Sequence, residues 1–214
     1  SADKIFIIPP TIKEEEFIVD TTIKDSYKDF DLVLVTIGHP NLTKGSDLLP
    51  QIANVLRERN PNLKFKILLI GVRYDNDYLK AIKLDIQKLG LDNHIELIPH
   101  SSQPLSYMKV ANVYLIPSRE DSFSLMSLQA VISDKPVVTF KDAIGSSEIF
   151  GESGFFEANY LNINDFVYQI EEIHTKPKLA LEKVALAKRI YNESLNFQEV
   201  NEKHFQTLMK LLNR

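Results

Sequence analysis

The feature that most restricts the fold of this sequence is a series of short apolar runs rich in β-branched residues. They lack the alternation of polar and apolar side chains that marks a half-exposed strand, so they indicate strands buried on both faces. The predicted strands are Ile5–Ile8, Leu32–Ile37, Phe65–Ile70, Ile95–Ile98, Val113–Ile116 and Pro136–Phe140. Apolar residues at helical spacing predict helices within Leu48–Leu56, Leu79–Leu89, Met108–Ala111, Leu125–Ile132, Phe166–Ile173, Leu179–Tyr191 and Phe197–Leu212.

Strands that alternate with helices favour a parallel sheet with right-handed helical crossovers. We therefore predict an α/β fold: a Rossmann-like, doubly wound parallel sheet of about six strands, with extra carboxyl-terminal helices. Ligands of such sheets bind beyond the carboxyl ends of the strands. The functional residues are therefore expected in the loops that follow Ile37, Ile70, Ile98, Ile116 and Phe140.

The chain divides into three predicted parts: a linker over residues 1–30, the sheet domain over residues 31–175, and carboxyl-terminal helices over residues 176–214. The apolar stripe of the last helix, Phe197–Leu212, is wide for a terminal helix. Two alternatives follow from that stripe. The helix packs on its own sheet, or part of it is made for a second domain.

Composition excludes several classes of function. The 214 residues include no cysteine, so disulfide frameworks, thiolate metal sites and cysteine nucleophiles are excluded. The formal net charge of −4 argues against nucleic acid as a partner. No apolar run approaches the ~20 residues that cross a bilayer, and no signal peptide opens the chain. We expect a cytoplasmic protein with at most peripheral contact with the inner face of a membrane.

Several catalytic patterns are missing. The loop Gly38–Gly45 lacks the glycine spacing of a phosphate-binding P-loop, and no G-x-G-x-x-G sequence is present, which disfavours a nicotinamide dehydrogenase. No G-x-S-x-G sequence is present either, which disfavours an α/β-hydrolase. The five histidines do not show the spacing of a zinc site, so we expect no metal.

The loop Gly38–Gly45 leaves a predicted strand and enters a predicted helix. Free N–H groups and the positive end of the helix dipole attract anions there, and Lys44 adds a cation. The alternative is a plain turn with a solvated lysine.

Two further loops carry carboxylates after a predicted strand. In Pro117–Leu125, Asp121 or Ser122 can cap the following helix, and its acids suit sugar hydroxyls. Gln129, eight positions after Asp121, is expected to line the same pocket; the alternative is a capping motif with a surface ion pair. In Lys141–Ile149, Glu148 either caps a helix or faces ligand hydroxyls.

In order and spacing, these loops resemble the carboxyl-terminal half of family 4 GT-B glycosyltransferases. The resemblance covers roughly residues 5–175 and is densest from Ala111 to Leu125. It also rests on Ile7-Ile8-Pro9-Pro10-Thr11, Val35-Thr36-Ile37-Gly38, Lys44-Gly45, Leu68-Leu69-Ile70-Gly71, Lys135-Pro136-Val137-Val138, Gly145 with Glu148-Ile149, and Gly154-Phe155. The first of these is similar to the hinge between the two domains of the family.

The resemblance implies a retaining transfer of a sugar from a nucleoside diphosphate to an acceptor hydroxyl, without a metal cofactor. It implies catalytic roles for Lys44, Asp121 and His39. The donor-binding residues that it implies are Gly38, Lys44, His100, Ser122, Ser124, Leu125, Gln129 and Glu148. The sequence departs from the family at His39, where an arginine is usual, and at Gln129, where an acid is usual. His39 lacks a permanent charge, and Gln129 keeps hydrogen-bonding capacity without one.

The implied partners are a nucleotide-sugar donor and an amino-terminal, acceptor-binding domain, so we expect the isolated chain to transfer nothing. Cell-surface polysaccharide or glycan synthesis is a common setting for the family. Two alternatives stay open: a catalytically weakened nucleotide-sugar-binding module, and a nucleotide-sugar epimerase.

Overall fold

The structure is a computed structural model that describes residues 6–13, 20–73, 76–101 and 103–212. Its centre is a sheet of six strands in the order β3-β2-β1-β4-β5-β6, and every neighbouring pair is parallel. The strands are β1 (Leu32–Ile37), β2 (Phe65–Val72), β3 (Ile95–Pro99), β4 (Val113–Ile116), β5 (Val137–Phe140) and β6 (Phe156–Ala158). The predicted α/β class and parallel sheet are confirmed.

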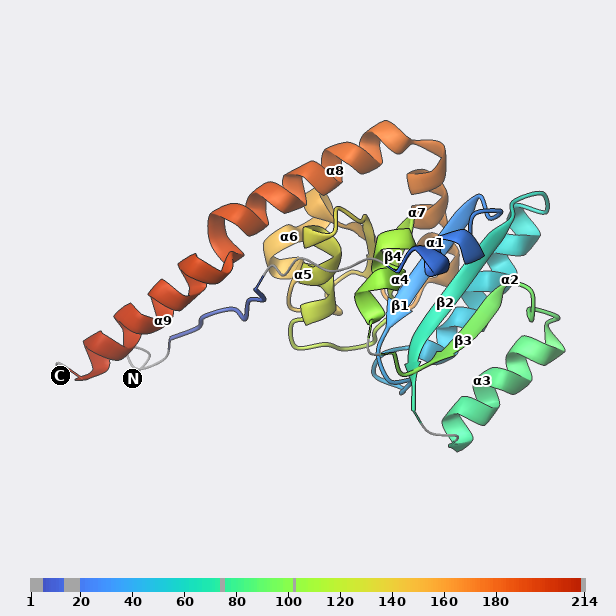
Figure 1. Ribbon diagram of the computed structural model, residues 1–214, viewed down its shortest axis with the longest axis horizontal. Helices are drawn as coiled ribbons and strands as arrows, with labels where there is room; N and C mark the ends of the chain where they lie inside the picture. The colour runs from blue at the N-terminus through green and yellow to red at the C-terminus, as the bar shows by residue number, and fades with distance from the viewer. Residues whose placement is uncertain (1–5, 14–19, 74–75, 102, 213–214) are drawn as a thin grey trace.

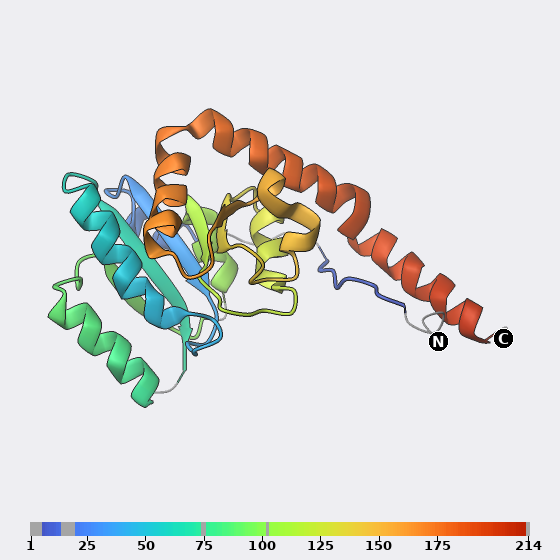
Figure 2. The same cartoon turned by 180° about the vertical axis from the view of Figure 1, so that it is seen from behind.

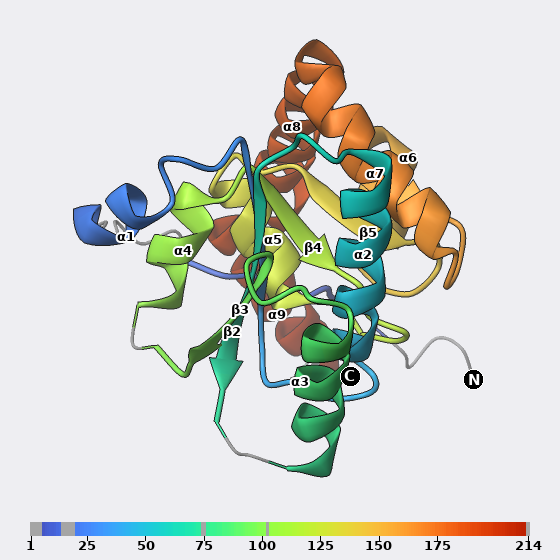
Figure 3. The same ribbon diagram turned by 90° about the vertical axis from the view of Figure 1, so that its right-hand side faces the viewer.

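Helices cover both faces of the sheet: α1 and α4 lie on one side, and α2, α3 and α7 on the other (Figure 3). The helices of the sheet domain are α1 (Thr21–Ser26), α2 (Leu49–Arg59), α3 (Asp77–Lys88), α4 (Pro104–Val110), α5 (Leu125–Ile132), α6 (Ser147–Gly154) and α7 (Ile163–Thr175). A short 3-10 helix, η2 (Ser46–Leu48), leads into α2. Helix α3 ends just before Gly90, which is left-handed with a φ of 64°, as is common after the last residue of a helix.

The core explains why the central strands read as unbroken apolar runs. Leu34, Leu68 and Leu115 are completely buried, because strands in the middle of a doubly covered sheet have no face toward solvent. No helix among the residues described here is long and apolar enough to span a bilayer.

One predicted strand is wrong and one strand was missed. Ile5 lies outside the described residues, and Phe6–Ile8 form no strand; Ile7 is 91% exposed. The two prolines that follow have no N–H to donate to a sheet. The sixth strand is instead β6, which has only three residues and is too short to show a pattern. Helix α1 was also not predicted, whereas α6 begins beside Glu148, where a helix start was one of the two alternatives.

The carboxyl-terminal helices leave the sheet domain. Helix α8 (Pro177–Ile190) packs against α5, α6 and α7, and a π-helical turn, η3 (Tyr191–Leu195), connects it to α9 (Phe197–Leu212). Helix α9 projects away from the domain, and residues 6–13 run beside it in both views (Figures 1 and 2). Only Val200 of α9 is buried.

Candidate functional site

A cavity of about 490 Å³ opens at the carboxyl ends of β1 and β4. These strands are neighbours at the point where the strand order reverses, which is where doubly wound sheets bind ligands. Six of the residues predicted from the sequence line this cavity. They are Gly38, Lys44, Asp121, Ser122, Ser124 and Leu125.

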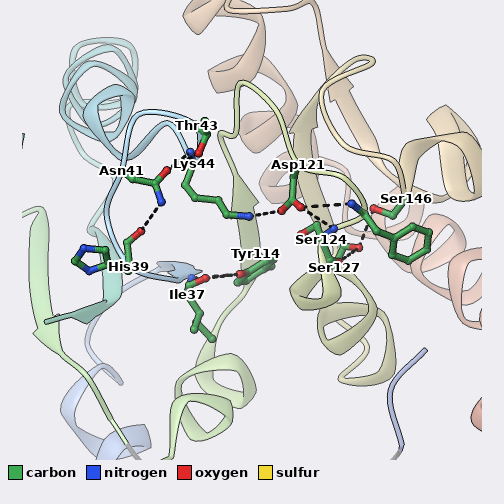
Figure 4. Close-up of polar contacts among 11 residues, drawn as sticks. Ile37, His39, Asn41, Thr43, Lys44, Tyr114, Asp121, Ser124, Ser127 and Ser146 are labelled. Atoms are coloured by element: carbon green, nitrogen blue, oxygen red, sulfur yellow. Dashed lines mark hydrogen bonds and ion pairs between the residues drawn. The ribbon is translucent and has the colours of Figure 1, made fainter. Parts of the chain in front are cut away.

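Lys44 and Asp121 meet inside the cavity from two different loops. The Lys44 Nζ lies 2.5 Å from Asp121 Oδ2, and the side chains are 43% and 12% exposed. The other carboxylate oxygen, Asp121 Oδ1, accepts hydrogen bonds from the backbone N–H of Ser124 at 3.1 Å and of Phe123 at 3.4 Å. Figure 4 shows the carboxylate between the ammonium and the start of α5. Asp121 therefore holds the turn that leads into α5, but the N-cap residue is Ser124, whose side chain makes no capping hydrogen bond.

Helix α5 begins in strained backbone at the wall of the cavity. Ser124, its N-cap residue, has a φ of 64°, which is uncommon for a residue other than glycine. The buried Ser127 hydroxyl donates to the Ser124 carbonyl at 2.7 Å and lies 2.9 Å from Ser146 Oγ. These bonds hold the start of α5, whose residues Ser124, Leu125 and Met126 line the cavity.

Two glycines allow the three loops to approach each other. A Cβ on Gly45 would lie 1.8 Å from the Pro117 carbonyl oxygen, and one on Gly145 would lie 2.1 Å from the Ser122 carbonyl oxygen. The loops are bonded at the same places: Arg119 N–H donates to Thr43 O at 2.7 Å, and Asp121 N–H donates to Ala143 O at 2.9 Å.

A polar cluster that was not predicted from the sequence holds the loop that carries Lys44 in place. The Arg119 guanidinium binds both carboxylate oxygens of Asp47, at 2.7 and 2.8 Å, and the Leu42 carbonyl at 2.8 Å. Tyr78 OH donates to Asp47 Oδ1 at 2.7 Å. Burial alone would raise the pKa of Asp47, but the hydrogen bonds from Arg119 and Tyr78 outweigh burial and lower it.

A second cavity, of about 300 Å³, adjoins the first and shares Asp121 and Ser122 with it. Glu148, from the first turn of α6, and Glu157, from β6, line the second cavity. Burial raises the pKa of the Glu157 carboxyl. Glu148 is thus brought close to Asp121, while Glu157 was not singled out from the sequence.

The remaining predicted residues lie outside both cavity walls. The His39 imidazole points away from Lys44 and Asp121 (Figure 4). His100, at the end of β3, has its Nδ1 3.4 Å from an Arg73 nitrogen. Gln129 is buried in α5 and does not line the pocket with Asp121. Helical spacing does not relate these two residues, because α5 begins only at Leu125.

Comparison with known proteins finds similarity to glycosyltransferases. The family described as "Glycosyl transferases group 1" matches residues 20–190. An uncharacterized glycosyltransferase of Haemophilus influenzae is 24% identical over 172 residues, which are 79% of this chain and 46% of that protein. The poly(ribitol-phosphate) alpha-N-acetylglucosaminyltransferase of Staphylococcus aureus is 26% identical over 75% of this chain and 32% of its own length. The chain thus spans less than half the length of these relatives.

Solved structures share the fold. A glycosyltransferase from Rickettsia africae superimposes with a TM-score of 0.83 at 14% identity, over 99% of this chain and 58% of that one. The carboxyl-terminal domain of a glycosyl transferase group 1 family protein, LpcC of Francisella tularensis, gives a TM-score of 0.71 at 17% identity, over 82% of this chain and 92% of that domain.

Proposed function

The chain belongs to the glycosyl transferases group 1 family, and from that premise we propose that it is the donor-binding half of a retaining glycosyltransferase. Its substrate would be a nucleoside-diphosphate sugar, and its reaction the transfer of that sugar to an acceptor hydroxyl. The observation that carries the proposal is the meeting of Lys44 with the N-terminus of α5 in the cavity between β1 and β4.

The diphosphate is assigned to this first cavity. Backbone N–H groups of the first turn of a helix, together with its dipole, form a binding site for anions. Lys44 adds a cation on the opposite wall. Preorganised positive charge of this kind stabilises a departing diphosphate, because the charge develops where the donors already point. Lys44 would therefore bind the diphosphate and assist its departure.

The transferred sugar is assigned to the side of the cavity that Asp121 and Ser122 share with the second cavity. Sugar hydroxyls donate well to carboxylates, and both Asp121 and Glu148 face this space. The transition state would resemble an oxocarbenium ion, as in glycoside hydrolysis, and Asp121 would orient the sugar as this state forms.

The other residues predicted from the sequence do not line the cavity, and their roles remain proposals. Gln129 would hold the ribose and His100 would lie near the base. His39 would assist the phosphates only if its ring turned toward Lys44. The departures at His39 and Gln129 favour a second candidate function, a nucleotide-sugar-binding module with weakened catalysis. Activity that appears only after His39→Arg and Gln129→Glu in the complete protein would support this second function.

The complete protein would supply the acceptor site from an amino-terminal domain. The chain covers less than half of its curated relatives, and α9 presents exposed apolar side chains that such a domain would cover. We therefore expect no sugar transfer by these 214 residues alone. A cytoplasmic role in cell-surface polysaccharide synthesis, near the inner face of a membrane, completes the proposal. The relative that acts on poly(ribitol-phosphate) supports it.

Calorimetry with UDP, GDP, ADP and their sugars tests the proposal. We expect one nucleoside diphosphate to bind, and Lys44→Gln to weaken its binding about ten- to a hundredfold, because a charge-assisted contact is lost. The exposed Lys88, at the end of α3, provides the matched control, and Lys88→Gln should leave the affinity unchanged. The proposal fails if no nucleotide binds, or if both variants bind like the unmodified chain.

A further inference from the structure

We propose that the Asp121 carboxylate occupies the anion site of the unliganded chain and exchanges with the incoming diphosphate. The inference rests on the proposed function, because it concerns the same cavity. It adds a step that the proposed function does not contain: the diphosphate binds in competition with a group of the protein itself.

One carboxylate already lies between the Lys44 ammonium and the N-terminus of α5 (Figure 4), where the diphosphate is assigned. Its Oδ2 pairs with the Lys44 ammonium at 2.5 Å, and its Oδ1 accepts from the Ser124 N–H at 3.1 Å. The side chain is only 12% exposed, so this pairing is partly shielded from water. The carboxylate is thus an anion beside a cation and a helix N-terminus, as the proposed diphosphate would be.

A bound diphosphate and this carboxylate cannot both keep these partners at low cost. Like charges that share a partly buried site repel each other. The contact of the ligand with Lys44 therefore has to replace the contact with Asp121. The free energy of diphosphate binding is then the difference between the contacts that the diphosphate makes and those that the carboxylate gives up. The native carboxylate therefore lowers the affinity for diphosphate.

The exchange needs a side-chain rotation and no loop movement. The backbone of Asp121 is held on both sides: its N–H donates to Ala143 O at 2.9 Å, and its carbonyl accepts from the Gly145 N–H at 3.0 Å. Asp121 also lines the second cavity. A carboxylate released from Lys44 can turn into that cavity, where the sugar is placed, so arrival of the diphosphate would present an acceptor for a sugar hydroxyl.

The opposite interpretation is that the pair is a permanent scaffold in which Asp121 aims Lys44 at the phosphates. The two interpretations predict opposite changes in diphosphate affinity when the carboxylate is removed. A scaffold predicts that loss of the carboxylate weakens diphosphate binding, whereas an exchanging carboxylate predicts that its loss strengthens binding.

The experiment is calorimetry on the 214-residue chain with inorganic pyrophosphate and with UDP, GDP and ADP as probes. For Asp121→Asn we expect binding about three- to tenfold tighter, because the competing charge is gone. Lys44→Gln should then cost more affinity in the Asp121→Asn background than in the unmodified chain. Asp142→Asn is the matched control: Asp142 is exposed and lines only the second cavity, so it removes the same charge nearby without freeing Lys44.

A second variant guards against loss of the helix cap. Asp121→Ser removes the charge but keeps an oxygen for the Ser124 N–H, and it should also bind pyrophosphate more tightly than the unmodified chain. Equal or weaker binding by both folded variants overturns the exchange, and equal tightening by Asp142→Asn does so too. In those cases the proposed function still stands if Lys44→Gln weakens binding. No binding of any probe to any of these proteins overturns both proposals.

Discussion

The position next to Lys44 requires glycine for two independent reasons. Gly45 has a φ of 66°, a left-handed conformation that costs other residues about 1–2 kcal/mol. Its missing side chain also leaves room for the Pro117 carbonyl oxygen, which a Cβ would approach to 1.8 Å. Gly90 separates the two reasons, because its φ of 64° is also positive but the nearest atom to a Cβ built there is an Arg57 side-chain nitrogen at 4.0 Å.

We predict that Gly45→Ala destabilises the chain by about 3 kcal/mol or more, since it combines backbone strain with a clash that only loop movement relieves. Gly90→Ala should cost about 1–2 kcal/mol, because it adds strain alone. Urea unfolding of both variants measures the two losses. Equal losses would show that the approach of the two loops is not tight. In Gly45→Ala, pyrophosphate affinity should also fall, because Lys44 moves with its loop.

Single residues also mark the limit of what the sequence could predict. Lys44 and Asp121 follow buried strands, and parallel strands bring their carboxyl ends to one edge, so their meeting could be predicted. The side-chain direction of His39 and the burial of Gln129 depend on where the loop bends and where α5 begins. Spacing along the chain does not contain that information.

At the scale of elements, the Lys44 loop is braced by its neighbours. Arg119, which follows β4, donates from two guanidinium nitrogens to the two carboxylate oxygens of Asp47 in η2. Tyr78 from α3 donates to the same carboxylate. The three groups come from three segments, so the cluster ties β1, β4 and α3 together behind the cavity. Arginine suits this position because its planar fork matches both carboxylate oxygens.

We predict that Asp47→Asn lowers stability at neutral pH by about 1–3 kcal/mol, because it leaves a charged partner without its carboxylate. The pKa of Asp47 is lowered in the folded chain. Its contribution is therefore present above the ordinary aspartate pKa of about 4, and is lost as pH falls through the lowered value. Unfolding curves at several pH values should show the variant and the unmodified chain converging at acid pH.

The control for this prediction is Asp77→Asn. Asp77 is 99% exposed and pairs with Lys80 on the surface of α3, so its loss should change stability by less than about 0.5 kcal/mol at any pH. A gap between Asp47→Asn and the unmodified chain that stays constant down to low pH would contradict the assigned role of the Asp47 charge.

The elements that were predicted correctly are those in which buried apolar residues form a pattern long enough to be recognised in the sequence. Strands β1 and β4 begin and end where the apolar runs do, because a polar residue precedes each run and a glycine or a proline follows it. Strand β6, with three residues, and α1, with six, are too short for periodicity to show. The run at Ile5–Ile8 is apolar, yet Phe6–Ile8 join no sheet, since pairing depends on a neighbouring strand that the local sequence does not reveal.

At the scale of the whole molecule, the two segments that flank the predicted sheet domain meet at one place. Tyr191 OH donates to the Ile12 carbonyl at 3.0 Å, and the Thr11 hydroxyl donates to the Leu195 carbonyl at 2.5 Å. The segment at residues 6–13 and helix α9 therefore leave the domain together (Figure 1). Pro10, from the same segment, reaches the wall of the first cavity. A domain attached here would sit beside the cavity that we propose for the donor.

The apolar face of α9 supplies a test of that arrangement. Phe205 and Leu208 are 56% and 58% exposed, so Phe205→Ser with Leu208→Ser should leave the melting temperature of the 214-residue chain unchanged. The buried Val200 is the control, and Val200→Ser should destabilise the same chain by about 2 kcal/mol. In the complete protein, the double variant should reduce sugar transfer while nucleotide affinity stays the same, because it would disturb only the contact between domains. Full transfer by that variant would show that α9 does not serve the second domain.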